Sequence, residues 1–116
     1  MAKCLIVDDS GMMRKMYAKA LKDAGFDYEI IEAENGKDGL SKLKSEKVDL
    51  ILVDAVMPEM GGVEFSKAVK SDPNLKGIPM IMITGKKEEA EGSAADAVLL
   101  KPFKPEDLKA TIEKIK

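Results

Sequence analysis

The sequence contains no histidine, and this absence removes several classes of function at once. Serine–histidine and cysteine–histidine catalysis are excluded, as are histidine-based zinc sites and any phosphohistidine carried by the chain itself. The single cysteine, Cys4, cannot form an internal disulfide. Because Cys4 lies within an apolar run, we expect a small buried core residue, and its unpaired thiol is consistent with a reducing cytoplasm.

Strong charge and long apolar runs are also missing. The formal net charge of -2 gives no reason to expect direct contact with nucleic acid or with an anionic membrane. No apolar run is long enough to span a bilayer, and the N-terminal segment is too short for a signal peptide. With 45% hydrophobic and 34% charged residues, the composition argues against disorder. We therefore expect one globular domain, residues 1–116, in the cytoplasm.

The most informative stretch is residues 48–58, VDLILVDAVMP. Its apolar run, residues 50–53, is unbroken and ends at Asp54. A short continuous apolar run is typical of a strand buried on both faces, as in a parallel sheet. Open α/β sheets bind their ligands at the carboxyl ends of such strands. Asp54 is therefore the first candidate for chemistry.

The rest of the chain alternates between apolar runs and helical spacing. Further strands are predicted at residues 4–7, 29–33, 78–83 and 97–100, of which 29–33 is the least apolar and so the nearest to an edge. Helices are predicted from the Ser10 cap to residue 24, from the Asn35-Gly36 turn to about residue 46, from residue 63 to 71, and over 105–115. Gly61-Gly62 is expected to form a flexible loop, and residues 86–95 only a turn or two of helix. This alternation predicts one doubly wound α/β domain with a five-stranded parallel sheet.

Four of the apolar runs end in a polar side chain that can act on a phosphoryl group. These residues are Asp8-Asp9, Asp54, Thr84 and Lys101. Because the carboxyl ends of parallel strands lie on one rim, we expect them to converge in one pocket. Each is weak evidence alone, since polar residues commonly end strands, but the combination is specific.

The expected chemistry follows from charge. Crowded carboxylates repel one another unless a cation neutralises them, and an all-oxygen site suits Mg²⁺. One carboxylate can then attack phosphorus and form an acyl phosphate. Phosphoryl transfer needs positive charge and hydrogen-bond donors around the phosphoryl oxygens. Mg²⁺ and Lys101 would supply the charge, and Thr84 the hydroxyl donor.

Five motifs spanning nearly the whole chain carry a family resemblance: VDDSGMMRKM (7–16), ENGKDGL (34–40), DLILVDAVMPEMGG (49–62), IPMIMITG (78–85) and LLKPF (99–103). In this order and spacing they resemble the response-regulator receiver domain, especially the stand-alone chemotaxis regulators. The resemblance implies a flavodoxin-like fold with strand order 2-1-3-4-5. It also implies a phosphorylation switch rather than a turnover enzyme, with only self-phosphorylation and slow self-dephosphorylation.

The resemblance also assigns the metal site. It implies that Asp54 is the phospho-acceptor and that Asp9 and Asp54 bind Mg²⁺ directly. The backbone carbonyl of Val56 would be the third protein ligand, and Asp8 would act largely through water.

The resemblance further implies that Thr84 and Lys101 contact the phosphoryl group, and that the Lys101-Pro102 peptide is cis. The donor would be a phosphohistidine on a sensor kinase or a phosphotransfer protein. Because no output domain is recognised in the sequence, the effect of phosphorylation would be transmitted through a downstream protein target.

Three features depart from the family pattern. Fewer residues than usual, 85–100, separate Thr84 from Lys101, which predicts a shortened or missing fourth helix. Val98 stands where the family usually has Tyr or Phe, so the familiar ring movement is absent or replaced. Val56 is apolar where polar side chains are frequent, and we hypothesise that it slows hydrolysis of the aspartyl phosphate.

Two other classes of function use the same fold. One is a receiver-like interaction module that works without phosphorylation. Two features are consistent with it: the short segment before Lys101, and the valine at position 98. A nucleotide or flavin carrier would need a phosphate-binding loop after the first strand, whereas this chain has the acidic Asp8-Asp9 pair there. An aspartyl phosphatase would have its two acids spaced by one residue rather than adjacent.

Overall fold

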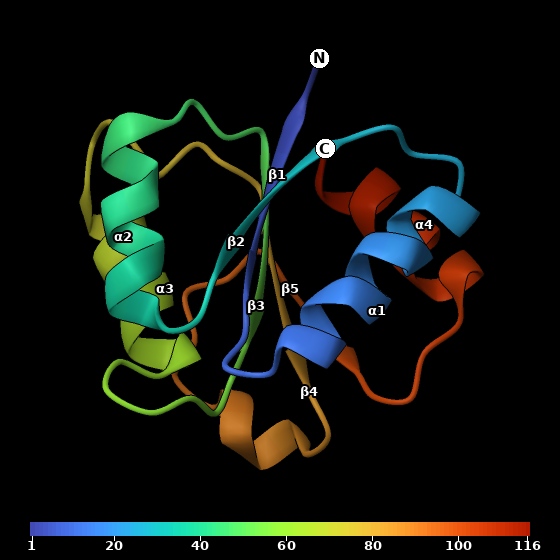
Figure 1. Cartoon of the computed structure of the whole chain (residues 1–116). Coiled ribbons are helices and arrows are strands. Elements are labelled where there is room, and N and C mark those ends of the chain that lie inside the picture. Colours follow the sequence, from blue (N-terminus) through green and yellow to red (C-terminus); the bar gives the residue numbers. More distant parts are fainter.

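Five parallel strands form one sheet in the order β2-β1-β3-β4-β5, as the computed structural model of residues 1–116 shows (Figure 1). The strands are β1 (Lys3–Val7), β2 (Glu29–Ala33), β3 (Leu50–Asp54), β4 (Met80–Thr84) and β5 (Ala97–Leu100). Every strand pair is parallel. The flavodoxin-like topology implied by the sequence is therefore confirmed, including the edge position of β2.

Helices cover both faces of this sheet. They are α1 (Gly11–Asp23), α2 (Gly36–Ser45), α3 (Gly62–Ser71), the short 3₁₀ helix η1 (Lys87–Ala90) and α4 (Pro105–Ile115). In Figure 1, α2 and α3 lie on one face and α1 and α4 on the other. None of these helices combines the length and the apolar character that crossing a membrane requires.

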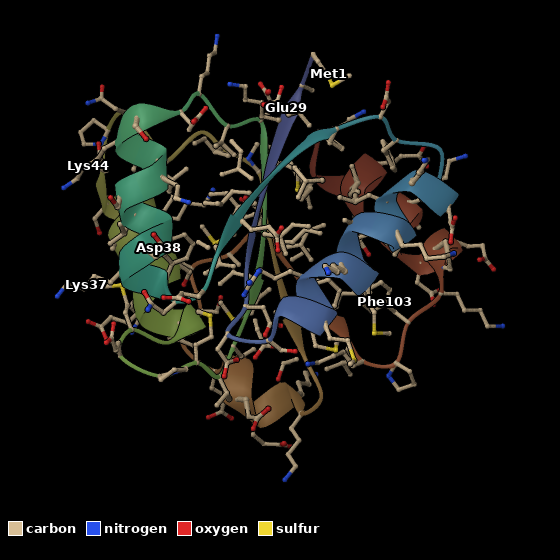
Figure 2. The ribbon with its side chains drawn as sticks, in the orientation of Figure 1. Met1, Glu29, Lys37, Asp38, Lys44 and Phe103 are labelled. Carbon is tan, nitrogen blue, oxygen red and sulfur yellow. The ribbon has the colours of Figure 1, made fainter.

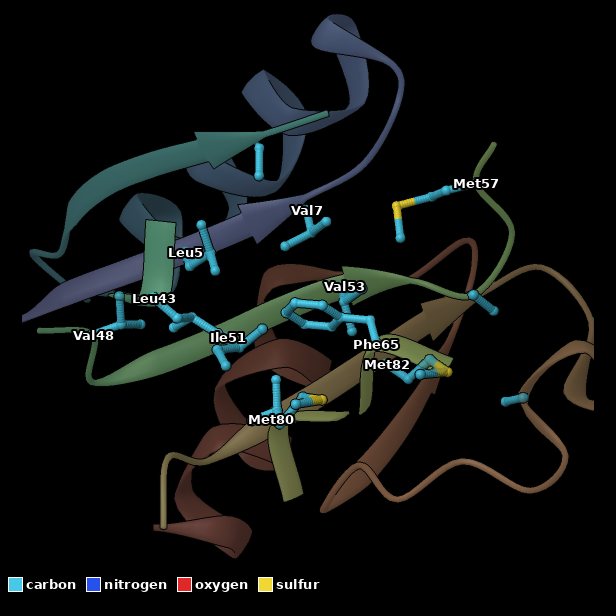
Figure 3. Close-up of a cluster of buried hydrophobic side chains, with 14 residues drawn as sticks. Leu5, Val7, Leu43, Val48, Ile51, Val53, Met57, Phe65, Met80 and Met82 are labelled. Carbon is cyan, nitrogen blue, oxygen red and sulfur yellow. The ribbon is translucent and has the colours of Figure 1, made fainter. Parts of the chain in front are cut away.

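The core has two layers because the central strands are covered on both faces. All residues of β3 and β4 are buried, which explains their unbroken apolar runs. Figure 3 shows one layer, where Phe65 of α3 lies among Val53 and Met82 of the sheet. The other layer packs α1 and α4 against the opposite face and includes Cys4, which is buried as predicted.

The predicted starts of the first two helices are confirmed by their caps. The Ser10 hydroxyl accepts a hydrogen bond from the Met13 N–H at 3.2 Å, and the Asn35 side-chain oxygen accepts one from the Asp38 N–H at 2.8 Å. Both contacts satisfy backbone donors that have no partner within the helix. The Asn35-Gly36 turn is thus the beginning of α2 itself.

Two local predictions were wrong. Gly61 and Gly62 do not form a flexible loop, because Gly62 is the first residue of α3 and is buried. Its N–H donates to the Ala55 carbonyl at 2.9 Å, and a Cβ added to it would lie 2.2 Å from the Asp54 carbonyl oxygen. Only glycine allows this close approach, which ties α3 to the end of β3. The fourth strand begins at Met80 rather than at residue 78.

The segment between β4 and β5 contains one short helix, as predicted. After η1 the chain runs without regular structure to β5, and it is fixed to α3 by side chains. The Ala94 N–H donates to the Ser66 hydroxyl at 3.0 Å, and Lys70 Nζ lies 2.9 Å from Asp96 Oδ2. Because no long helix covers this side of β5, Val98 is 43% exposed and Leu100 46% exposed.

The contact at Gly62 generates a stability prediction. Gly62→Ala should lower the free energy of unfolding by about 1–3 kcal/mol, the usual cost of an overpacked site, because the new methyl group meets backbone rather than a side chain. Urea denaturation followed by circular dichroism measures the change.

Gly77→Ala is the matched control. A Cβ at Gly77 meets nothing within 4 Å, and its backbone angle is not in the left-handed region. This variant should stay within about 0.5 kcal/mol of the parent. Equal stability of the two variants would contradict the close approach at Gly62.

Candidate functional site

The carboxyl ends of the strands meet at the lower edge of the sheet in Figure 1, where η1 also lies. Three polar residues are buried there: Asp8 is 3% exposed, Asp54 8% and Thr84 2%. The parallel register explains the placement, since Asp54 pairs with Ile83 and Thr84 with Leu100, just before Lys101. These side chains come from separate strands, so only the sheet brings them together.

Asp54 and Lys101 form the central contact of the site. Lys101 Nζ lies 3.0 Å from Asp54 Oδ1, and the Val56 N–H donates to Asp54 Oδ2 at 3.2 Å. The Lys101 N–H donates to the Thr84 carbonyl at 2.8 Å, which fixes the lysine backbone beside β4. The following peptide, Lys101-Pro102, is cis. Both Asp54 oxygens therefore have a positive or polar partner.

Asp8 is less well compensated. Its Oδ1 accepts a hydrogen bond from the Ser10 N–H at 2.8 Å, but its buried Oδ2 has no partner. Burial is the main cause that raises the pKa of Asp8, and the charges of Asp54 and Asp9 add to it. The Ser10 hydrogen bond and the Lys101 charge oppose this rise in pKa without cancelling it. The ionised Asp8 side chain thus forms no ion pair and is only partly compensated.

The acidic side chains fit a hydrated hard cation rather than a cage of carboxylates. No three acidic side chains lie close enough to hold an ion by themselves. The predicted ligand set differs from such a cage, because it combines Asp9 and Asp54 with the Val56 carbonyl. The unpartnered Asp8 oxygen suits a contact to an ion through water, and the donors are all oxygen, as Mg²⁺ prefers.

Asp9 points towards solvent, in contrast to Asp8. It is exposed and borders a polar depression shared with Glu34, Asn35 and Glu59. Asn35 Nδ2 donates to Glu59 Oε2 at 3.2 Å and closes one side of this depression. Asp9 is thus reachable from outside, next to the buried Asp8.

Thr84 does not contact Asp54. Its hydroxyl donates to Glu89 Oε1 of η1 at 2.8 Å and also lies 3.1 Å from the Lys86 carbonyl oxygen. The predicted role of Thr84 as a donor to a phosphoryl group therefore requires this hydroxyl to change its partner. Sequence reasoning did not single out Glu89, which lies in the segment with the weakest pattern.

Tyr17 is a second residue that the sequence did not mark as part of the site. Helical spacing assigned it to the apolar face of α1, and the ring is indeed buried and stacks on Phe103 at 6.0 Å between centroids; Figure 2 shows Phe103 beside α1. Its hydroxyl, however, is a buried group without a hydrogen-bond partner. Burial raises the pKa of Tyr17, and the charges of Asp8 and Asp54 and the closeness of the hydroxyl to the Asp8 carboxylate raise it further. No spacing rule reveals where a buried phenol directs its hydroxyl.

Comparison with known proteins agrees with this geometry. The family model for the response regulator receiver domain matches residues 4–113. The chain belongs to this family. Receiver domains of this kind are switches in two-component signalling rather than classical enzymes.

Among the relatives, the chain is similar to the chemotaxis protein CheY of Pseudomonas aeruginosa, with 36% identity over 118 residues, 97% of this chain and 94% of the relative. It is 40% identical to the phosphate regulon transcriptional regulatory protein PhoB of the same organism, but spans only 50% of that protein's length. Among solved structures, Vibrio cholerae CheY4 has a TM-score of 0.85 and 39% identity, covering 100% of this chain and 99% of that one. The response regulator TrrA of Thermotoga maritima, solved with Mg²⁺ and beryllofluoride, has a TM-score of 0.85 and 30% identity, with 100% of both chains covered.

The uncompensated charge of Asp8 generates a pH prediction. Because its pKa is raised on folding, Asp8 contributes its full stability below the ordinary pKa of 3.8, and that contribution is lost as the pH rises through the raised value. Asp8→Asn should therefore raise the free energy of unfolding at pH 7 in EDTA by about 1–2 kcal/mol, the scale for a buried polar group without a partner. The gain should shrink towards zero near pH 3.

Urea denaturation over this pH range measures the effect, with Asp9→Asn as the control. Asp9 is exposed, so its substitution should change stability by less than about 0.5 kcal/mol. A destabilised Asp8→Asn variant at pH 7 would show that the carboxylate is compensated after all.

Proposed function

We propose that this receiver domain, residues 1–116, accepts a phosphoryl group on Asp54 from a phosphohistidine of a sensor kinase or phosphotransfer protein, with Mg²⁺ as cofactor. The observation that carries the proposal is the 3.0 Å contact between Asp54 and Lys101 at the edge where one oxygen of buried Asp8 has no hydrogen-bond partner. The phosphorylated domain would signal through a changed protein-binding surface to a downstream protein. We place it in the cytoplasm, in keeping with its unpaired Cys4 thiol.

The reaction is a displacement at phosphorus. An oxygen of Asp54 attacks the phosphoryl group, a new P–O bond forms, and the P–N bond of phosphohistidine breaks with its electron pair returning to the imidazole. The ammonium of Lys101, already beside Asp54, balances negative charge on the transferred group. Asp9, Asp54 and the Val56 carbonyl would hold Mg²⁺, and Asp8 would orient its water. When bound, Mg²⁺ supplies positive charge to the phosphoryl oxygens.

A second candidate, an interaction module that needs no phosphorylation, is favoured by one observation. Val98 and Leu100 are exposed apolar side chains on β5 and border a shallow groove with η1. Such side chains can contact a partner whatever the state of Asp54. The labelling experiment below separates the two candidates.

Asp54→Asn should abolish Mg²⁺-dependent incorporation of phosphate from radiolabelled acetyl phosphate, because the amide is not a nucleophile towards phosphorus. EDTA should abolish it in the parent protein as well. Acid-stable and base-labile behaviour of the label, read on gels, identifies an acyl phosphate.

Asp27→Asn serves as the control, since Asp27 is exposed and its side chain forms no hydrogen bond or ion pair. It should be labelled like the parent. Label retained in Asp54→Asn would refute the assignment of Asp54, and a parent that takes no label in Mg²⁺ would favour the phosphorylation-independent module.

Val56 gives a prediction for the lifetime of the phosphate. Its side chain is 57% exposed, and its N–H is bonded to Asp54, so it borders the route by which water reaches the acyl phosphate. Val56→Asn should shorten the lifetime about fivefold, the scale of one hydrogen bond to the attacking water. The measurement is loss of label after removal of acetyl phosphate.

Val98→Asn is the matched control, because it makes the same change at an exposed valine on β5. Its phosphate lifetime should equal that of the parent. An unchanged or longer lifetime in Val56→Asn counts against the hypothesis that the apolar side chain slows hydrolysis.

A further inference from the structure

In the resting chain the Thr84 hydroxyl is bound by a carboxylate from η1. Thr84 Oγ1 donates to Glu89 Oε1 at 2.8 Å, with the Lys86 carbonyl oxygen as a more distant acceptor at 3.1 Å, and the Lys86 N–H donates to the same threonine oxygen at 3.3 Å. Thr84 is only 2% exposed, so water has little access to this hydroxyl. A hydrogen bond to an ionised acceptor is roughly twice as strong as one between neutral groups. Glu89 therefore directs the Thr84 hydroxyl towards η1 rather than towards Asp54.

The threonine hydroxyl has one proton to donate. It cannot donate to Glu89 and to a phosphoryl oxygen at the same time. Both acceptors are anionic oxygens, so they compete for the same hydroxyl proton. If Thr84 donates to a phosphoryl group on Asp54, its bond to Glu89 must break.

Loss of the Thr84–Glu89 hydrogen bond would affect the exposed residues of η1, because η1 is held in place just beyond Glu89. Ala90 is buried in the core layer of Figure 3, and farther along the Ala94 N–H is bonded to Ser66. Release of Glu89 therefore removes a side-chain tie between η1 and the end of β4, and the turn is then held by its backbone hydrogen bonds. This turn presents Lys87 and Glu88, which border the groove beside β5.

We propose that Glu89 is a positioning residue that holds the Thr84 hydroxyl in the unphosphorylated state, and that a phosphoryl group on Asp54 displaces it and so alters the exposed surface of η1. This inference rests on the proposed function, because it requires phosphorylation of Asp54. In this proposal the Glu89 carboxylate competes with the phosphoryl group for the Thr84 hydroxyl, and so lowers the affinity of the site for a phosphoryl group.

The test is the affinity for beryllofluoride with Mg²⁺, measured by NMR titration of the Gly85 amide resonance. Glu89→Ala removes the competing carboxylate and should tighten binding about three- to tenfold, the range for the net contribution of one hydrogen bond. Glu88→Ala is the matched control, since it removes the same charge from the neighbouring exposed position of η1, and Glu88 has no bond to Thr84. It should change the affinity by less than about twofold.

A double-mutant cycle separates competition for the hydroxyl from general charge effects. In the Thr84→Ala background, the additional Glu89→Ala change should have no more effect than Glu88→Ala. Hydrogen exchange gives a second readout: beryllofluoride should speed exchange at the Glu89 and Glu91 amides of the parent, and Glu89→Ala should show this faster exchange without ligand.

Equal affinities of Glu89→Ala and Glu88→Ala would overturn the inference, as would a Glu89→Ala effect that persists without the Thr84 hydroxyl. Both results leave the proposed function intact, provided that the parent binds beryllofluoride and Asp54→Asn does not. Failure of the parent to bind would overturn the proposed function and this inference together.

Discussion

The ion pair between Asp54 and Lys101 is the contact on which the site depends. It joins the ends of β3 and β5, which lie on either side of β4 in the sheet, at 3.0 Å. A buried carboxylate is costly unless a positive group or hydrogen bonds compensate it, and here Lys101 and the Val56 N–H do so. The parallel sheet makes the pairing possible, because it sets the carboxyl ends of all strands along one edge. A shift of β5 against β4 would carry the lysine away from its partner.

The same edge holds a second acid whose compensation is incomplete. Asp8 shares the buried space with Asp54, yet one of its oxygens has no partner and its pKa is raised. Lys101 forms its ion pair with Asp54 and not with Asp8. The side chains of the site therefore carry excess negative charge, and this imbalance favours the binding of a cation.

The shortened connection between β4 and β5 changes how the site communicates with the surface. A single turn, η1, takes the place of a full helix, and it leaves Val98 and Leu100 exposed on the edge strand. It also brings Glu89 to the Thr84 hydroxyl. With valine at position 98, no aromatic ring on β5 can follow Thr84, so a link through Glu89 and η1 offers a different route from site to surface.

Local patterns were enough to predict the alternation of strands and helices, the buried central strands, the cap at Ser10, the turn at Asn35-Gly36 and the weak segment before β5, because each depends on residues close together in the chain. The candidate residues Asp8, Asp54, Thr84 and Lys101 were likewise visible as polar ends of apolar runs. The tertiary structure alone decided that the Thr84 hydroxyl turns to Glu89, that the Tyr17 hydroxyl is buried near the charges of Asp8 and Asp54, and that Gly62 touches the backbone of β3. Side-chain direction and close backbone approach depend on neighbours from other elements, whose positions no spacing in a single sequence records.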